Sequence, residues 1–185
     1  YPCWATFTFQ STGAGESAKE IIAANGYQLL KTGDPNGPFW MPAMSDAPLR
    51  GFGGHEWFWE PDDEQLIYPL ENLVDMYQKS VGRNSTLILG ITPDTTGLIP
   101  DPDVKRLQEL GDKIKKQYTH PIAETLHATS LRIKPAQVIS TIVIREDIEQ
   151  GERIRNYILE GKTGKEWIQL SEGSCIGHKR IEIFE

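Results

Sequence analysis

The segment Thr86-Leu87-Ile88-Leu89-Gly90-Ile91 decides the fold class of this chain of 185 residues. Its apolar side chains follow one another without alternation, so both faces of a strand formed here are apolar. This pattern is typical of a parallel strand that is buried on both faces. The segment therefore predicts an α/β fold with a parallel sheet.

A helix is predicted on each side of this strand. Residues 69–81 place apolar side chains at helical spacing, and Gly82 suits the left-handed position after a helix end. On the other side, Asp101 as N-cap and Pro102 at the first helical position predict a helix at 103–118. The apolar positions are Leu70, Leu73, Val74, Tyr77 and Val81 in the first helix and Val104, Leu107, Leu110 and Ile114 in the second.

The C-terminal third is predicted to contain only strands. Its strand-like runs are 139–145, 153–160, 166–170 and 180–184, and glycines lie between them. This spacing is typical of an antiparallel sandwich, although so few strands leave its edges open. We place a boundary near residues 119–128, which divides the chain into the modules 1–120 and 129–185.

The first residues of the chain give weaker patterns. Residues 1–10 alternate loosely between apolar and polar side chains and predict a strand, and residues 16–24 predict a short helix. The glycine-containing run at 12–19 lacks the Gly-Lys-Ser/Thr ending of a phosphate-binding loop. A nucleotide site is therefore not expected there.

Residues 38–60 are predicted to form a binding surface. They hold three tryptophans, a histidine, an arginine and three carboxylates. Proline and glycine punctuate them too heavily for a long helix or a central strand, so a loop is expected. Flat aromatic faces beside carboxylates suit a sugar, because ring C–H groups stack on indoles and hydroxyls bond to charged acceptors.

Charge and cysteine content limit the possible functions. The formal net charge is −7 at pH 7, with no stripe of lysine and arginine, which argues against a nucleic-acid binder. No apolar run has the length of a membrane-spanning helix. Cys3 and Cys175 match no metal or redox spacing, and two unpaired thiols or one disulfide between them both remain open.

Three segments, taken in order, match the patterns of one known family. Residues 40–50 read Trp-Met-Pro-Ala-Met-Ser-Asp-Ala-Pro-Leu-Arg, and residues 57–59 read Trp-Phe-Trp. They resemble Trp-x-Pro-Ala/Pro-Glu-x-Asp-x-x-Ile-Arg and Gly-Trp-Phe-Tyr/Trp in the α-L-fucosidases of glycoside hydrolase family 29. Residues 77–99 are similar to the last barrel strand of that family and its loop. Residues 144–153 and 176–180 resemble the β-sandwich that follows the barrel.

This resemblance implies a fold of two parts. Residues 1–120 would be the closing part of a (β/α)8 TIM barrel, and residues 129–185 the opening part of a discoidin-like β-sandwich. The fold class is then α/β followed by all-β. The barrel portion is expected to pack against an N-terminal part that precedes this chain. Barrel sites lie at the carboxyl ends of the strands, where the loop after residue 38 is expected.

The resemblance also implies an activity. Family members are retaining exo-glycosidases, so the expected reaction removes terminal α-L-fucose from a fucosylated oligosaccharide or glycoconjugate. Two carboxylates about 5–5.5 Å apart share the work in such enzymes, with no metal or cofactor. One attacks the sugar, and the other protonates the leaving oxygen and later activates water. An extracellular, periplasmic or cell-surface location is implied as well.

The catalytic carboxylates are where this chain departs from the family. The acid/base glutamate of the family corresponds to Met44, which cannot carry a proton, and the nucleophilic aspartate lies upstream of this chain. Glu56, between His55 and Trp57, is the expected substitute acid, and Asp46 is second. The alternative is a non-catalytic carbohydrate-binding relative that lost its acid/base at Met44. The chain by itself is expected to be inactive.

The other candidates are expected to bind substrate: Trp40, Met44, Arg50, His55, Trp57 and Trp59. Each has a structural alternative. The tryptophans are also suited to packing, Arg50 to a bridge with Asp46, and His55 to a surface loop. The acidic run Glu60, Asp62, Asp63 and Glu64 is expected to be solvated. A further possibility is that the sandwich only packs against the barrel.

Overall fold

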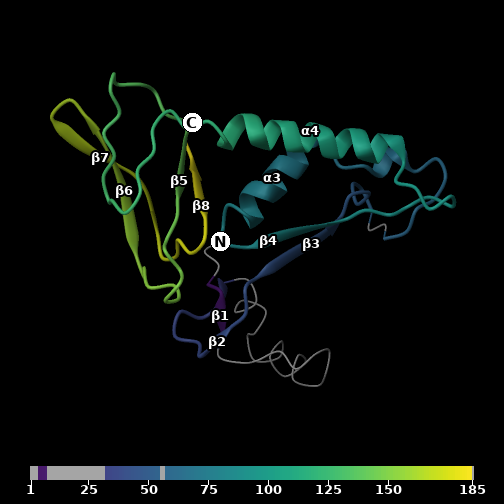
Figure 1. Cartoon of the computed structure of the whole chain (residues 1–185), viewed down its shortest axis with the longest axis horizontal. Coiled ribbons are helices and arrows are strands. Elements are labelled where there is room, and N and C mark those ends of the chain that lie inside the picture. The colour runs from purple at the N-terminus through teal and green to yellow at the C-terminus, as the bar shows by residue number, and fades with distance from the viewer. Residues whose placement is uncertain (1–3, 8–31, 55–56, 185) are drawn as a thin grey trace. The chain divides into compact units, whose positions relative to one another are not determined.

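A computed structural model describes residues 4–7, 32–54 and 57–184 (Figure 1). Its elements are β1 (Thr6–Phe7), β2 (Phe39–Trp40), β3 (Met44–Pro48), the 3-10 helix η2 (Glu64–Leu66), α3 (Leu70–Ser80), β4 (Thr86–Gly90), α4 (Asp101–Tyr118), β5 (Thr141–Ile144), β6 (Tyr157–Thr163), β7 (Glu166–Gly173) and β8 (Arg180–Ile183).

The chain forms two compact units whose segments alternate along the sequence. The first comprises Tyr1–Ser45, Gln78–Leu87 and Ser140–Glu185, and the second comprises Asp46–Tyr77 and Ile88–Ile139. The division of the sequence into modules 1–120 and 129–185 stays a prediction. Each unit is therefore described by itself.

The core of the second unit is formed largely by α3 and α4 (Figure 1). Its buried side chains are Leu49, Leu73, Val74 and Leu110, and the partly buried ones around them are Ile67, Tyr68, Leu70, Met76, Leu89, Leu107 and Ile114. The predicted helical spacing is thus confirmed at six positions, because residues three and four apart share one face of a helix. Val104 is an exception and is exposed.

Strands β3 and β4 are neighbours and run in the same direction. The Thr86 N–H donates to the Ala43 carbonyl oxygen over 2.9 Å, and the Leu49 N–H donates to that of Gly90 over 2.8 Å. Residue numbers rise together along both strands, so the pair is parallel, as residues 86–91 predicted. The barrel to which such a pair could belong stays a prediction.

Only one face of β4 is covered among the described residues. Leu89 packs against the helical core, whereas Ile88 on the opposite face is 41% exposed. The expected burial of both faces is therefore wrong for this part of the chain, because α3 and α4 pack on the Leu89 side. Successive side chains of a strand point to opposite faces, so the neighbouring residues Ile88 and Leu89 differ in burial.

The loop expected at 38–60 is interrupted by two strands, which corrects that prediction. Phe39–Trp40 form β2, and Met44–Pro48 form β3. Proline has no N–H to give to a partner strand, but Pro48 is the last residue of β3. The N–H of the next residue, Leu49, makes the bond to β4 instead. Proline therefore ends this strand rather than preventing it.

Two details of the predicted helix ends are wrong. Helix α4 begins at Asp101 with Pro100 at the N-cap, so Asp101 lies in the first turn and is not the cap. Gly82 does not take the left-handed conformation, which Asn84 adopts instead with φ 65°. A Cβ at Gly82 would lie 2.3 Å from the carbonyl oxygen of Gln78. Close packing, and not positive φ, requires the glycine.

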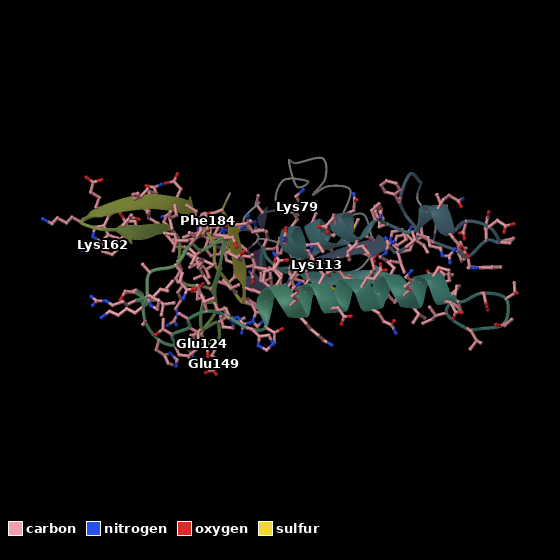
Figure 2. All side chains as sticks on the ribbon, turned by 90° about the horizontal axis from the view of Figure 1, so that it is seen from above. Lys79, Lys113, Glu124, Glu149, Lys162 and Phe184 are labelled. Carbon is pink, nitrogen blue, oxygen red and sulfur yellow. The ribbon has the colours of Figure 1, made fainter. Side chains whose placement is uncertain are left out.

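Two antiparallel strand pairs dominate the first unit. β5 pairs with β8, and β6 pairs with β7 around a turn in which Gly164 has φ 65°. Lys162, near the tip of this hairpin in Figure 2, places its ammonium 5.4 Å from the ring centroid of Trp167. The predicted antiparallel strands are confirmed. Their completion into a sandwich stays a prediction.

Strand β6 begins at Tyr157, four residues after the predicted start at 153. The N–H groups of Arg153 and Ile154 donate to the Glu146 carboxylate, that of Ile154 over 2.9 Å. Backbone groups satisfied by a side chain do not need a partner strand. The carboxylate of Glu146 therefore delays the start of the strand.

The N-terminal residues join the first unit through β1, which pairs antiparallel with β2. Trp4, Ala5 and Phe7 are buried, so the strand expected within residues 1–10 is confirmed at Thr6–Phe7. The helix expected at 16–24 lies outside the described residues. Cys175 is buried, and Cys3 lies outside the described residues.

A polar network surrounds Glu182 on β8. Its carboxylate accepts bonds from the Tyr157 hydroxyl at 2.6 Å and the Arg180 Nε at 2.7 Å, and Arg83 lies 3.3 Å away. Burial by itself raises the pKa of Glu182, but these donors and positive charges outweigh it, so its pKa is lowered. Burial and the bond to Glu182 raise the pKa of Tyr157 to about 12.

Tyr157→Phe is expected to lower the free energy of unfolding at pH 7 by about 1.5 kcal/mol, as for hydrogen bonds to charged groups. The folded-state pKa of Glu182 lies below its unfolded value of about 4.3, so the stabilisation is present above that pH. It is lost as the pH falls through the folded pKa. Chemical unfolding of both chains at pH 7 and over a series of decreasing acidic pH values should show a difference that shrinks as the pH falls through the folded-state pKa of Glu182. A constant difference would contradict the linkage.

Candidate active site

The carboxyl ends of β3 and β4 lie side by side, because the two strands are parallel (Figure 1). The chain continues from β3 into residues 49–63 and from β4 into residues 91–100. In α/β barrels the loops at this end of the strands carry the active site. These two segments, both in the second unit, therefore define the candidate site.

Trp57 is held against the end of β4. Its ring is so close to Gly90 that a Cβ on that glycine would lie 3.1 Å from a ring carbon. The Thr92 hydroxyl donates to the Trp57 carbonyl oxygen over 3.3 Å. The side chain remains 39% exposed. This geometry supports Trp57 as a surface on which a sugar ring could stack, a role that stays a prediction.

Arg50, two residues beyond β3, is buried between two carboxylates. Its Nε donates to Asp103 Oδ1 over 3.1 Å, its Nη2 donates to Asp103 Oδ2, and its Nη1 donates to Asp63 Oδ1. The hydrogen bond to Asp103 raises the pKa of Arg50, against the lowering effect of burial. The guanidinium therefore links the end of β3 to α4 and to the residue before η2.

This arrangement corrects the expectations for Arg50. Its partners are Asp63 and Asp103, and not Asp46. With a side chain only 5% exposed, the guanidinium is enclosed and does not support the predicted contact with substrate. The structural bridge is the role that the geometry shows.

Sequence reasoning missed the two carboxylates of this bridge. Asp63 was expected to be solvated because it stands in an acidic run, yet it is buried. Asp103 is the first residue of the predicted helix at 103–118, and its side chain is fully enclosed. The only available signal was the general rule that a buried arginine needs acidic partners.

Asp94 shapes the loop after β4, and it was also missed. Its Oδ1 accepts bonds from the Thr96 hydroxyl and N–H at 2.6 and 2.8 Å and from the Leu98 N–H at 3.3 Å. These bonds, led by that of the Thr96 hydroxyl, lower the pKa of Asp94. Gly97 completes the turn with φ 83°. The sequence signal was Asp-x-Thr-Gly, a turn pattern.

Met44 and Asp46 share one exposed face of β3, since alternate residues of a strand point the same way. Met44 is 70% exposed and is the first residue of the strand, so it stands at the amino end. Ser45 points to the other face, where its hydroxyl is 2.9 Å from that of Ser85. Asp46 is therefore nearer than Met44 to the carboxyl end, where a site is expected.

The remaining predicted residues are distributed as follows. Trp40 lies in β2 of the first unit and is exposed, and Trp59 in the second unit is half-buried. His55 and Glu56 lie outside the described residues. Phe58 is exposed in the second unit. The structure thus groups Arg50 and Trp57 with the ends of β3 and β4 and leaves the catalytic carboxylates untested.

Residues 4–7, 32–54 and 57–184 contain neither a metal-binding cluster nor a membrane-spanning helix. No three histidine, cysteine, aspartate or glutamate side chains there gather as a metal site. No helix of this described portion is both long and apolar enough to cross a membrane.

Comparison with known proteins identifies the family to which the chain belongs. The family model for Alpha-L-fucosidase matches residues 25–118, which is half of the chain. Its members are glycoside hydrolases, in keeping with an aromatic residue at the carboxyl ends of parallel strands. The chain belongs to the alpha-L-fucosidase family.

Individual relatives agree with this assignment. The chain is 49% identical to a provisionally assigned alpha-L-fucosidase of Bacteroides thetaiotaomicron, with a TM-score of 0.89, over 100% of this chain and 42% of that one. It is 26% identical to Alpha-L-fucosidase 1 of Arabidopsis thaliana, over 98% of this chain and 41% of that protein. A family-29 fucosidase of Ruminococcus gnavus in complex with fucose is 26% identical, with a TM-score of 0.68, over 83% of this chain and 37% of that one. The chain thus spans about two fifths of the length of these relatives.

Proposed function

We propose that the full-length protein is a retaining exo-glycosidase that hydrolyses terminal α-L-fucose from a fucosylated oligosaccharide or glycoconjugate. The observation that carries the proposal is the Trp57 ring held against Gly90 at the carboxyl ends of β3 and β4. A sugar is expected at this end of a barrel. Family membership and the relative with bound fucose add support. An extracellular, periplasmic or cell-surface location is proposed with it.

The proposed mechanism uses two carboxylates. One lies outside this chain and attacks the anomeric carbon. The other is Glu56, which precedes Trp57 in sequence and protonates the leaving oxygen before activating water. Asp46, exposed on β3, is the second candidate for this role. Trp57 holds the apolar face of the sugar by stacking, so the reacting bond is presented to the carboxylates.

The rival is a non-catalytic relative that binds fucose and has lost its acid at Met44. The exposed methionine on β3 is the observation in its favour. The position of Met44 weakens this alternative, because Met44 and the carboxyl end lie at opposite ends of β3, a strand of five residues that rises about 3.3 Å per residue. A carboxylate at residue 44 would lie at the amino end of β3, away from the end where the sugar is expected. Catalysis by a residue closer to the carboxyl end is therefore the proposal that the geometry favours.

One experiment separates these functions. Full-length protein is given an aryl α-L-fucoside, which has an easy leaving group, and a natural fucosyl glycan. Turnover of both is the expected result. Retained fucose binding without turnover of either would support the binding protein and contradict the enzyme. Residues 1–185 alone are expected to turn over neither, because they span about two fifths of the related enzymes.

Gly90→Val is expected to weaken fucose binding by the full-length protein about 10-fold, equivalent to about 1.4 kcal/mol. A branched side chain at Gly90 would enter the space of the Trp57 ring, which lies 3.1 Å from even a single added carbon. Valine itself suits a strand, so the fold should survive. Titration calorimetry measures the affinity.

A second glycine provides the control for this substitution. Gly111 lies in α4, and a Cβ there would meet nothing within 4 Å. Gly111→Ala should leave affinity unchanged and stabilise the helix by up to about 1 kcal/mol. Equal affinities for wild type and Gly90→Val would show that Trp57 is not part of the sugar site.

A further inference from the structure

A buried ion cluster stands at the base of the segment that carries Trp57. Arg50 and Asp63 flank this segment, here named the Trp57 loop and described at residues 51–54 and 57–62. Asp103 comes from the first turn of α4. The side chains of Arg50, Asp63 and Asp103 are only 5, 9 and 1% exposed. These three residues are called the clamp below.

The clamp joins the two ends of the Trp57 loop and ties them to a helix. The guanidinium donates to both oxygens of Asp103 and to one of Asp63. Its planar fork fixes the direction of each carboxylate, which the single ammonium of a lysine does not do. Two backbone bonds close the same base, from Phe52 N–H to the Leu66 carbonyl at 2.9 Å and from Tyr68 N–H to that of Leu49 at 3.1 Å.

The charges of the clamp favour a geometric role over a stabilising one. One buried cation faces two buried anions, and ion groups of this kind repay their desolvation poorly. Among the described residues, Asp63 Oδ2 is buried without a hydrogen-bond partner. Such a cluster fixes the orientation of its residues, because charge-assisted and bidentate hydrogen bonds tolerate little deviation from their preferred geometry. The orientation it defines here is that of the Trp57 loop.

We propose that Arg50, Asp63 and Asp103 are positioning residues of the fucosidase, setting the place of Trp57 at the carboxyl ends of β3 and β4. They act on the reaction through the Trp57 loop and do not touch the sugar. This inference rests on the proposed function and deepens it. A shift of about 1 Å in a group that places the substrate can cost about 100-fold in rate.

The test uses full-length Arg50→Lys, Asp63→Asn and the double variant. Each single variant should lower kcat/KM on an aryl α-L-fucoside about 10- to 100-fold. The loss in the double variant should be smaller than the product of the two single losses, because the two residues act together. Hydrogen exchange should become faster in peptides of the Trp57 loop. Lys113→Gln is the control, because Lys113 (Figure 2) lies in an exposed pair with Glu71 at 3.2 Å. It should change neither readout.

Three results would overturn the proposal. A lowered melting temperature with unchanged kcat/KM and exchange in both single variants would reduce the clamp to a structural contact. A loss confined to Arg50→Lys, with Asp63→Asn like wild type, would indicate that Arg50 contacts the sugar directly. If Arg50→Lys fails to fold, Asp63→Asn carries the test, and wild-type behaviour of that variant refutes the clamp.

Failure of the proposed function can be recognised separately. A wild-type protein without turnover would refute the enzyme. The hydrogen-exchange measurement then tests the role of the clamp by itself, because it does not depend on turnover. Faster exchange of the Trp57 loop in Asp63→Asn supports the clamp, and unchanged exchange overturns it.

Discussion

Glu56→Gln in the full-length protein is expected to lower kcat/KM, which reports the first step, on a natural fucosyl glycan about 10²–10⁴-fold, the usual loss of a general acid. The sugar alcohol that leaves is a poor leaving group and needs a proton. An aryl leaving group departs without one, so the first step on an aryl α-L-fucoside should change far less. The ratio of the two losses is therefore the measurement. It distinguishes a lost acid from a disturbed site, which would slow both substrates equally.

The second half of a retaining reaction provides an independent check. The same carboxylate then acts as base toward water, so the glycosyl-enzyme intermediate should accumulate in Glu56→Gln. Azide attacks without a base and should restore turnover with release of fucosyl azide. Glu60→Gln, at an exposed position close in sequence, is the control and should behave as wild type. Equal losses on both substrates without azide rescue would exclude Glu56 as the acid, and the same experiment on Asp46→Asn would follow.

Gly177→Ala is expected to destabilise the protein by about 3 kcal/mol. Gly177 has φ 60°, a conformation that costs residues with a side chain about 1–2 kcal/mol. A Cβ there would also lie 2.2 Å from the side-chain amide of Asn84. That amide donates to Glu152 and accepts from the His178 N–H at 2.7 Å. Displacing it would leave a buried carboxylate short of a donor, which costs about 1–3 kcal/mol more.

Gly151→Ala isolates the first of these two contributions. Gly151 has φ 80°, yet a Cβ there would meet nothing within 4 Å. Its substitution should therefore cost only the backbone strain, about 1 kcal/mol. Unfolding in guanidinium chloride, followed for both variants and wild type, measures the difference. Equal destabilisation by the two substitutions would show that the Asn84 contact contributes nothing.

Asn84 also illustrates how a sequence pattern can mislead. Asn84-Ser85-Thr86 has the form of a glycosylation acceptor. The nitrogen that a glycan would occupy donates instead to the buried carboxylate of Glu152. Glu152 also accepts from the Ala5 N–H at 2.9 Å, so one carboxylate joins segments distant in sequence. Burial raises the pKa of Glu152, which local sequence does not indicate.

Local periodicity predicted the regular elements well. The spacing of Leu73 and Val74 in α3, and of Leu107 and Leu110 in α4, identified the faces that form the core. The run 86–91 predicted a parallel strand. Patterns of this kind are reliable because a helix or strand repeats its geometry, so burial on one face leaves a period in the sequence. The family motif in residues 40–59 was equally local.

The candidate site was less accessible to sequence reasoning. Trp57 was identified by residue type and by the family motif, but its support by Gly90 and Thr92 joins segments that are 33 residues or more apart in sequence. For Arg50 the sequence left two predictions open, a contact with substrate and a bridge to Asp46. The burial of Arg50 depends on Asp103, 53 residues away, and no periodicity marks such a pair.

The sequence by itself thus determined α3, α4, the parallel strand β4, the antiparallel strands of the C-terminal third and the family, because each leaves a local pattern of side chains. Only the tertiary structure decided what the polar residues do. It buried Arg50 between Asp63 and Asp103, set Met44 at the amino end of β3 and placed Trp57 against Gly90. The physical reason is that the energy of a charge or an aromatic face depends on its neighbours in space, and folding brings those neighbours from distant parts of the chain.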